Sequence, residues 1–494
     1  MPLAVAVIRR CVSGYTAADL MQRLLLALFA ALPLAAQAAE PAPSAIDQLR
    51  QRVAGGLTEL GQWAFEQQLF AECSSVARLA RRVVESASTT YTQGLAKLDV
   101  DGFGILYRRA RQKSGPEFDK RRDKVVKPAA KEFVQLAKQA EEAGDEPTAE
   151  AGYLLAHQLD GRADAATALR KRDFDVVFNY GAIPRAEKQA VRKHLRTLGG
   201  KLFEEADLKP ELKFWRDAWG LQTKHYRFVT DAPHGTVFAF AQACEDLHDA
   251  WEPMMQQAGF PLRPLSKPAT VYLFNSPVAY QIICRLGGED PPADTLGFYS
   301  PQSRVGYFYD DPEFYEGSLG LLFETFYHEG THQLLDHRMK AGRRGDIAKH
   351  PLVWVEEGFC VYMETMVVTE EGDKRIKTFG REIDDDWGMG LAGLARDQLK
   401  PLDKFVHMNR QVWDDYDASY PHAALVMHYM LESGEPELRA KGFALLREEI
   451  TQGGLRKAPF FEWLGRPVAE FEAGLKAFSE RSAKDLKVRT YKKK

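Results

Sequence analysis

The chain has 494 residues, of which 45% are hydrophobic and 27% are charged, and this is the composition of an ordinary globular protein. Its length predicts two or three domains. The net charge is only −3 and both signs are interspersed, so the composition gives no reason to expect nucleic acid as a partner.

Residues 1–38 are predicted to form a secretory signal peptide whose typical features begin at Met21, because residues 1–20 fit such a peptide poorly. Met21 and Arg23 precede an apolar run over residues 24–36, and the letters AQA at 36–38 form a small-x-small cleavage pattern. This run is shorter than the about 20 residues that span a bilayer. We therefore expect translation from Met21, cleavage after Ala38, and a periplasmic or secreted bacterial protein without a stable membrane span. A buried apolar helix is the competing interpretation.

Four cysteines follow the expected cleavage point, and an exported protein would carry them into an oxidising compartment. Two alternatives stay open for these thiols. They form disulfides, for which three complete pairings exist, or they remain free and buried in a chain of this size. The four positions are Cys73, Cys244, Cys284 and Cys360.

Residues 39–220 are predicted to form a helical region, because Ala, Leu, Glu, Lys and Arg recur there at spacings of three and four. The letters GDEP at 144–147 predict a break between two of its helices. The Ala-rich alternation is loosely like that of tetratricopeptide helical pairs, and an irregular helical bundle is the alternative. We consider this region a possible binding surface for a protein partner.

Residues 221–480 are predicted to form a second domain that begins with short strands. Runs rich in β-branched and aromatic residues occur at 225–232, 269–275, 296–300 and 304–310, and the last two predict a hairpin. A helix is expected at 235–259, and helices again dominate from Leu319 onward. The predicted fold class is therefore α+β: mostly helical, with a small mixed sheet beside an active-site helix and a helical N-terminal region. Residues 481–494 read as a basic tail.

The segment "FETFYHEGTHQLLDH" (323–337) contains the pattern H-E-x-x-H on a predicted helix. Residues four apart share one helix face, so His328 and His332 can reach the same metal ion, with Glu329 beside the first. Gly330 costs about 1 kcal/mol relative to alanine inside a helix. We attribute it to the space that a substrate cleft needs.

A catalytic zinc ion needs a third protein ligand and one open position. The metzincin continuation is excluded, because Leu335 and Arg338 occupy the positions of its glycine and third histidine. The segment "HPLVWVEEGFCVYMETM" (350–366) offers two carboxylates, Glu356 and Glu357, at the start of an apolar helix. Buried carboxylates need a compensating charge, which a divalent cation would supply. Cys360 in the same helix is either a soft ligand or a small core residue.

The letters WVEEGF at 354–359 resemble the W-L-x-E-G-F signature that follows H-E-x-x-H in gluzincins of the aminopeptidase N type. This resemblance implies that Glu357 is the third zinc ligand. It also implies that Glu364, seven residues further, holds a ligand histidine by a hydrogen bond. The substrate-amine motif G-x-M-E-N of those aminopeptidases does not occur upstream of His328, so aminopeptidase activity is not implied.

The segment "YPHAALVMHYML" (420–431) is similar to the gluzincin helix whose tyrosine stabilises the oxyanion, and the resemblance implies Tyr420 in that role. Three other donors compete with it: Tyr416, His422 and His428.

The order of these segments resembles a narrower group, the bacterial peptidase-MA-like family of unknown function within the gluzincin clan. The resemblance covers about residues 224–478 and includes the ending "FFEWLGRPVAEFEAGLKAF". Ala424 departs from it, because the family pattern has tryptophan there.

The function that this resemblance implies is that of a zinc metallopeptidase. Zinc would activate a water molecule, Glu329 would act as general base, and Tyr420 would stabilise the oxyanion. A strand within residues 297–309 would bind an extended peptide by backbone pairing. Two alternatives remain: a catalytically silent metal-binding scaffold that binds a partner through its helical N-terminal region, and a zinc hydrolase of non-peptide amides or esters.

Overall fold

The computed structural model describes residues 44–84, 103–177, 181–184, 189, 193–212, 215, 217–291, 295–310, 315–316, 318–339, 353–372, 374–380, 382–383, 385–452, 459–488 and 492–493. The predicted signal peptide lies outside these residues. By its internal contacts the chain divides into residues 1–48 and 49–494, and apart from residues 44–48 the fold below belongs to the second unit. Among the described residues, helices with the length and apolar character of a bilayer-spanning segment are absent.

The N-terminal region begins with helices and is joined to the sheet by short strands. Its elements are α3 (Ala45–Glu66), α4 (Phe70–Val83), α6 (Phe103–Glu142), α7 (Glu146–Asp160), α8 (Ala163–Lys171), β1 (Phe174–Val177), β2 (Gly181–Pro184), β3 (Lys201–Leu202) and α10 (Glu205–Leu212). The predicted break at 144–147 is confirmed, because α7 starts where Asp145 accepts a hydrogen bond from the Thr148 amide. The predicted helical repeat stays a prediction.

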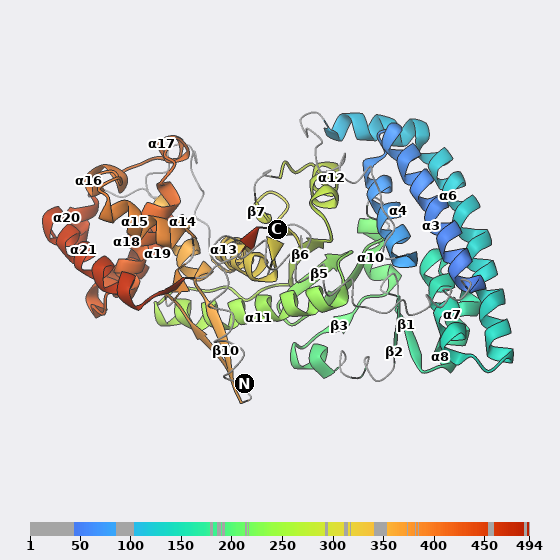
Figure 1. Cartoon of the computed structure of the whole chain (residues 1–494). Helices are drawn as coiled ribbons and strands as arrows, with labels where there is room; N and C mark the ends of the chain where they lie inside the picture. The colour runs from blue at the N-terminus through green and yellow to red at the C-terminus, as the bar shows by residue number, and fades with distance from the viewer. Residues whose placement is uncertain are drawn as a thin grey trace, which may run out of the picture. The chain divides into compact units, whose positions relative to one another are not determined.

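The central part of the chain alternates strands and helices (Figure 1). Its elements are β4 (Trp219–Gln222), β5 (Tyr226–Thr230), α11 (His234–Gln257), β6 (Ala269–Phe274), α12 (Pro277–Gly287), β7 (Gly297–Ser300), β8 (Val305–Tyr309), β9 (Tyr315–Glu316) and α13 (Ser318–Arg338). The four predicted strands and the helix between the first two are confirmed, and β7 and β8 form the predicted hairpin.

A six-stranded mixed sheet has the order β3-β4-β5-β6-β8-β7. The pairs β5–β6 and β6–β8 are parallel, and the other pairs are antiparallel. Side chains alternate between its two faces: Phe228 packs in the core with α11 and α13, whereas its neighbour Val229 packs with residues of α12. Helix α11 runs across the sheet in Figure 1. The α+β class predicted from the sequence is therefore confirmed.

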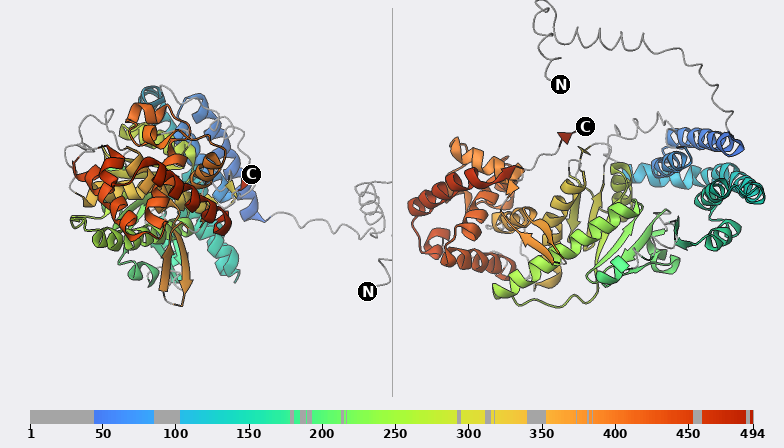
Figure 2. Two further views of the ribbon diagram at one scale, coloured as in Figure 1. Left: turned by 90° about the vertical axis from the view of Figure 1, so that its left-hand side faces the viewer. Right: turned by 60° about the horizontal axis from the view of Figure 1, so that its bottom comes forward.

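The C-terminal part is a cluster of helices with a two-stranded ribbon. Its elements are α14 (Val353–Glu364), β10 (Val367–Glu371), β11 (Lys374–Thr378), β12 (Glu382–Ile383), α15 (Asp385–Ala395), α16 (Leu402–Phe405), α17 (Arg410–Asp414), α18 (Ser419–Glu432), α19 (Pro436–Gln452), α20 (Phe460–Leu464), α21 (Val468–Asp485), β13 (Lys487–Val488) and β14 (Lys492–Lys493). Figure 2 shows the β10–β11 ribbon projecting from these helices.

The predicted boundaries differ from the structure in two places. The region expected to be helical up to residue 220 contains β1 to β3 and the start of β4, and β3 and β4 belong to the six-stranded sheet. The expected basic tail from residue 481 starts inside α21, and β13 pairs with β12 while β14 pairs with β9. These strands have two to four residues each, and tertiary pairing rather than local alternation creates them.

Candidate metal centre

Helix α13 carries the H-E-x-x-H pattern between the sheet core and helix α14. Leu322 and Phe326 of this helix are buried in the core that it shares with α11 and the sheet. Gly330 is buried on that same side, where an added Cβ would lie 2.8 Å from both Leu247 and Phe326. Our assignment of Gly330 to a substrate cleft is therefore wrong, since the missing side chain permits close packing of α13 on α11.

Two histidine nitrogens converge on one oxygen of Glu357. His328 Nε2 lies 3.4 Å and His332 Nε2 lies 3.3 Å from Glu357 Oε2. The histidines come from α13, and Glu357 comes from the N-terminal half of α14. The structure thus brings together the three residues that the sequence predicts as metal ligands.

A second carboxylate lies behind each histidine. His328 Nδ1 is 3.2 Å from Glu364 Oε2, and His332 Nδ1 is 3.0 Å from Glu356 Oε1. Because a carboxylate only accepts hydrogen bonds, each Nδ1 carries a proton, and a metal ion would have to replace the second proton, the one on each Nε2. Glu364 lies where we expect it. Glu356 was considered as a ligand, and its role behind His332 was missed; its position beside Glu357 was the only signal.

Arg410 holds the other oxygen of Glu357. Its Nη1 donates a hydrogen bond to Glu357 Oε1 across 3.0 Å, and its Nε donates to Asp414 across 2.9 Å. Burial raises the pKa of Glu357, but the neighbouring His332 and His328 lower it more, and the pKa ends well below its ordinary value. The carboxylate is therefore ionised, with one oxygen toward the guanidinium and the other toward the imidazoles.

The neighbouring acidic groups also shift the pKa values of His328 and His332. Burial lowers the pKa of His328, but hydrogen bonds to Glu357 and Glu364 outweigh it, so the pKa lies well above its ordinary value. Burial also lowers the pKa of His332, but the nearby Cys360 and Glu357 outweigh it, and this pKa too lies well above its ordinary value. The space between the imidazoles and Glu357 thus favours positive charge, either protons or a cation.

Glu329 is held by the backbone of strand β7. The Tyr299 amide donates a hydrogen bond to Glu329 Oε2 across 2.8 Å, and the Tyr299 hydroxyl donates to Asp336 across 2.6 Å. Strand β7 lies at one edge of the described sheet. One outward amide of the strand that we expect to pair with a peptide is therefore already bonded to Glu329.

A cavity of about 370 Å³ opens onto these groups. Of the four candidate oxyanion donors, Tyr420 is the one that lines it, with its ring centroid 6.1 Å from that of His328. Tyr416 instead accepts a hydrogen bond from the Lys400 amide. The two histidines considered as oxyanion donors are buried outside this cavity: His422 stacks on Phe405, and His428 stacks on Trp387. The remaining lining residues are Tyr299, Pro301, His328, Glu329, His332, Asp336, Val353, Glu356, Glu357, Arg410 and Glu449.

Helix α13 is fixed along its length by polar contacts with three other elements. Besides the two contacts from Tyr299, Gln333 donates a hydrogen bond to the Thr270 carbonyl of β6 across 2.9 Å. At the end of the helix, Arg338 donates to His248 of α11 across 2.9 Å and also contacts Glu252. These contacts set the rotation of the helix about its axis.

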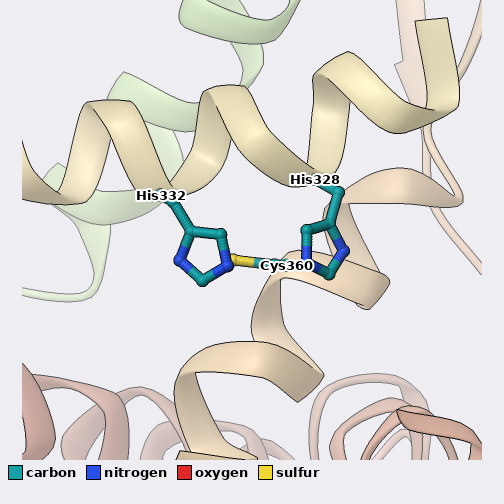
Figure 3. Close-up of side chains that lie close together, drawn as sticks. All are labelled: His328, His332 and Cys360. Atoms are coloured by element: carbon teal, nitrogen blue, oxygen red, sulfur yellow. The ribbon is translucent and has the colours of Figure 1, made fainter. Parts of the chain in front are cut away.

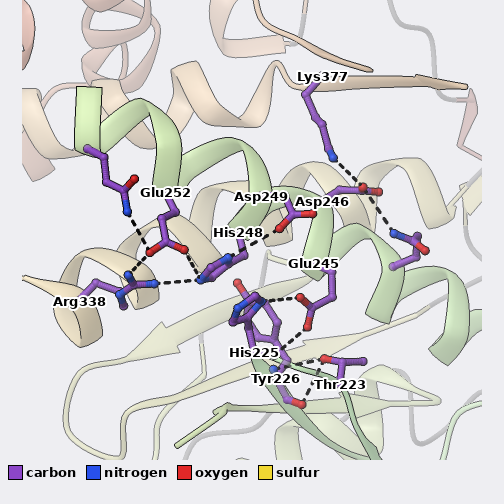
Figure 4. Close-up of polar contacts among 12 residues, drawn as sticks. Thr223, His225, Tyr226, Glu245, Asp246, His248, Asp249, Glu252, Arg338 and Lys377 are labelled. Atoms are coloured by element: carbon purple, nitrogen blue, oxygen red, sulfur yellow. Dashed lines mark hydrogen bonds and ion pairs between the residues drawn. The ribbon is translucent and has the colours of Figure 1, made fainter. Parts of the chain in front are cut away.

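A second group of possible metal ligands, His225, His248 and Asp249, lies beside this anchor (Figure 4). The two imidazoles stack with centroids 3.4 Å apart. Since arginine only donates, His248 Nε2 must accept from Arg338, and the proton then sits on Nδ1. His248 therefore has no lone pair left for a metal ion, and the group is better described as a network that ties α11 to α13.

The four cysteines of the described chain are free, buried thiols, so none of the disulfide pairings forms. The sequence also suggested Cys360 as a possible soft metal ligand. Ligand atoms of His328, His332 and Cys360 lie within 4.8 Å of one another (Figure 3).

Comparison with known proteins adds no assignment to this geometry: no family model matches the chain, and no curated protein gives a significant match.

Proposed function

We propose that the protein is an exported zinc metallopeptidase of the gluzincin type, which hydrolyses peptide bonds. The observation that carries this proposal is the convergence of His328 Nε2 and His332 Nε2 on Glu357 Oε2 at 3.4 and 3.3 Å. Glu364 and Glu356 accept the protons on the two Nδ1 atoms, so a metal ion would replace only the proton on each Nε2.

The three donors suit a zinc ion. With bonds of about 2.0–2.1 Å and tetrahedral angles, two ligand atoms are about 3.3–3.4 Å apart. The two nitrogen–oxygen distances match this separation. Two neutral imidazoles and one carboxylate are also the ligand set of known catalytic zinc sites, which keep a further position open.

When bound, zinc would supply a Lewis acid and make a water molecule acidic enough to react near neutral pH. Glu329 would take a proton from that water and deliver it to the leaving amine. The Tyr299 amide keeps one oxygen of Glu329 in place, so the other oxygen is available for this transfer. The Tyr420 hydroxyl, at the wall of the cavity, would donate a hydrogen bond to the developing oxyanion.

The test combines metal analysis with hydrolysis of an unstructured protein. We expect one zinc ion in the wild type and in Glu329→Gln, activity in the wild type alone, and neither metal nor activity in the double variant His328→Ala/His332→Ala. A wild type that binds no zinc would overturn the proposal. Zinc in the wild type and in Glu329→Gln with no hydrolysis by either would favour the silent scaffold, and an ester-only activity would favour the non-peptide hydrolase.

A further inference from the structure

Cys360 lies on the same face of α14 as Glu357, three residues further along the helix. Its side chain is completely buried, and its sulfur lies within 4.8 Å of a ring nitrogen of His328 and of His332. Figure 3 shows the thiol extending from α14 toward the two imidazoles of α13. The sulfur is therefore placed beside the nitrogens that face Glu357.

The surroundings of Cys360 differ from those of the other buried thiols. Cys244 and Cys284 pack within apolar clusters on either side of the sheet. Within the described residues, only Cys360 belongs to a group of three potential metal ligands. A small apolar residue would fill the same space, but it would not offer a soft donor to an ion held by the imidazoles.

We propose that the Cys360 thiolate is a fourth protein ligand of the ion bound by His328, His332 and Glu357. This inference rests on the metal site of the proposed function. On binding, the S–H bond breaks, a sulfur–metal bond forms, and the proton passes to solvent. The carboxylate and the thiolate together balance the two positive charges of the ion.

Coordination by sulfur leaves the open position in place. Cys360 does not line the 370 Å³ cavity, whereas both histidines, Glu357 and Glu329 do. The thiolate therefore approaches the ion from the protein interior, and the position facing the cavity is kept for water or substrate. A catalytic zinc ion can expand from four to five ligands in the transition state, and the proposed site would use the fifth position for water or substrate. The added charge raises metal affinity and makes the site selective for soft-tolerant ions such as zinc and cobalt over magnesium or calcium.

Cobalt(II) distinguishes these ligands by absorption, because a thiolate ligand adds an intense sulfur-to-cobalt charge-transfer band in the near ultraviolet. We expect this band in the cobalt-loaded wild type and in Cys284→Ala, and its loss in Cys360→Ser and Cys360→Ala. The visible bands of cobalt held by the histidines should remain in all four proteins. Zinc affinity should fall by about tenfold or more in the two Cys360 variants.

Cobalt bound by the wild type with its visible bands but without the near-ultraviolet band would overturn the thiolate ligand and leave the proposed function intact. Absence of any bound cobalt or zinc would overturn both. If the Cys360 variants fail to fold, X-ray absorption of the zinc-loaded wild type decides the question, because a zinc–sulfur distance of about 2.3 Å is expected with the thiolate and only nitrogen and oxygen neighbours without it.

Discussion

Arg410 Nη1 donates a hydrogen bond to Glu357 Oε1 across 3.0 Å, on the side of the carboxylate that faces away from both histidines. The arginine thus orients the carboxylate without approaching the imidazoles. A contact of this kind acts on metal affinity, because it fixes a ligand before the ion arrives.

We expect Arg410→Met to weaken zinc binding by about 10–100-fold, since methionine keeps an apolar stem and removes the donors to Glu357. Competition with a chromophoric chelator measures this affinity. Arg285→Met is the matched control, because Arg285 pairs with Asp290 on another part of the fold. Equal zinc affinities in the two variants would show that Arg410 does not orient the carboxylate.

Substitutions of Glu364 and Glu356 should lower zinc affinity according to how well the new side chain accepts a hydrogen bond from Nδ1. Glu364→Leu removes the acceptor for His328 Nδ1, and we expect zinc affinity to fall by about 10–100-fold. Glu364→Gln keeps a carbonyl acceptor and should lose much less. The same pair of changes at Glu356 tests His332. If leucine and glutamine behave alike at both positions, hydrogen bonding to Nδ1 is not the cause.

Tyr420→Phe should lower kcat by about 100- to 1,000-fold while leaving zinc content and KM nearly unchanged, because the hydroxyl would act only in the transition state. Tyr416→Phe is its control, since the Tyr416 hydroxyl accepts from the Lys400 amide and lies outside the cavity lining. Steady-state kinetics on a peptide substrate compare the two. A larger loss in Tyr416→Phe would reverse the assignment.

Gly358 permits the close approach of α14 and α18. An added Cβ there would lie 2.8 Å from the Ala423 carbonyl oxygen. We expect Gly358→Ala to lower the free energy of unfolding by about 1–3 kcal/mol, measured by urea denaturation. Gly55→Ala is the counterpart, because nothing lies within 4 Å of its Cβ in helix α3, and it should stabilise by up to about 1 kcal/mol. Equal midpoints for both variants would contradict the packing argument.

Acid should destabilise the fold through His422. Burial lowers the pKa of this histidine from 6.5 to about 3. Between pH 6.5 and pH 3 the imidazole of His422 is therefore protonated in the unfolded chain but neutral in the folded chain. The free energy of unfolding is highest above pH 6.5 and decreases as the pH falls toward 3. At pH 5 the loss is about 2 kcal/mol from this residue.

The measurement is urea unfolding at pH 8 and pH 5 in the presence of EDTA, which keeps metal release out of the comparison. His422→Gln should show a smaller difference between the two pH values than the wild type. Identical differences would mean that His422 does not contribute to the acid sensitivity.

The sequence predicts the parts of this site that depend on local periodicity. The spacing of four between His328 and His332 places both on one helix face, and that relation survives any packing of the helix. The strands with alternating apolar residues and the helix break at Asp145 were predictable for the same reason. The strands β1 to β4 were not, because they are short and gain their conformation from pairing.

The contacts between α13 and α14 were harder to predict. Which of the two adjacent glutamates faces the imidazole nitrogens depends on how α14 is rotated against α13, and only the resemblance distinguished Glu357 from Glu356. The packing role of Gly330 depends on Leu247, which is far away in the sequence. Neither the rotation of α14 nor the packing of Gly330 can be predicted from the residues that are adjacent in the sequence.

Helix α13 is bonded to β6, β7 and α11 at successive turns. A helix restrained in this way loses little conformational entropy when a metal ion binds, because its backbone and side chains are already ordered in the folded protein. Calorimetry of zinc uptake should therefore show almost no ordering penalty from α13, and cutting one restraint, as in Gln333→Ala, should make the uptake entropy less favourable.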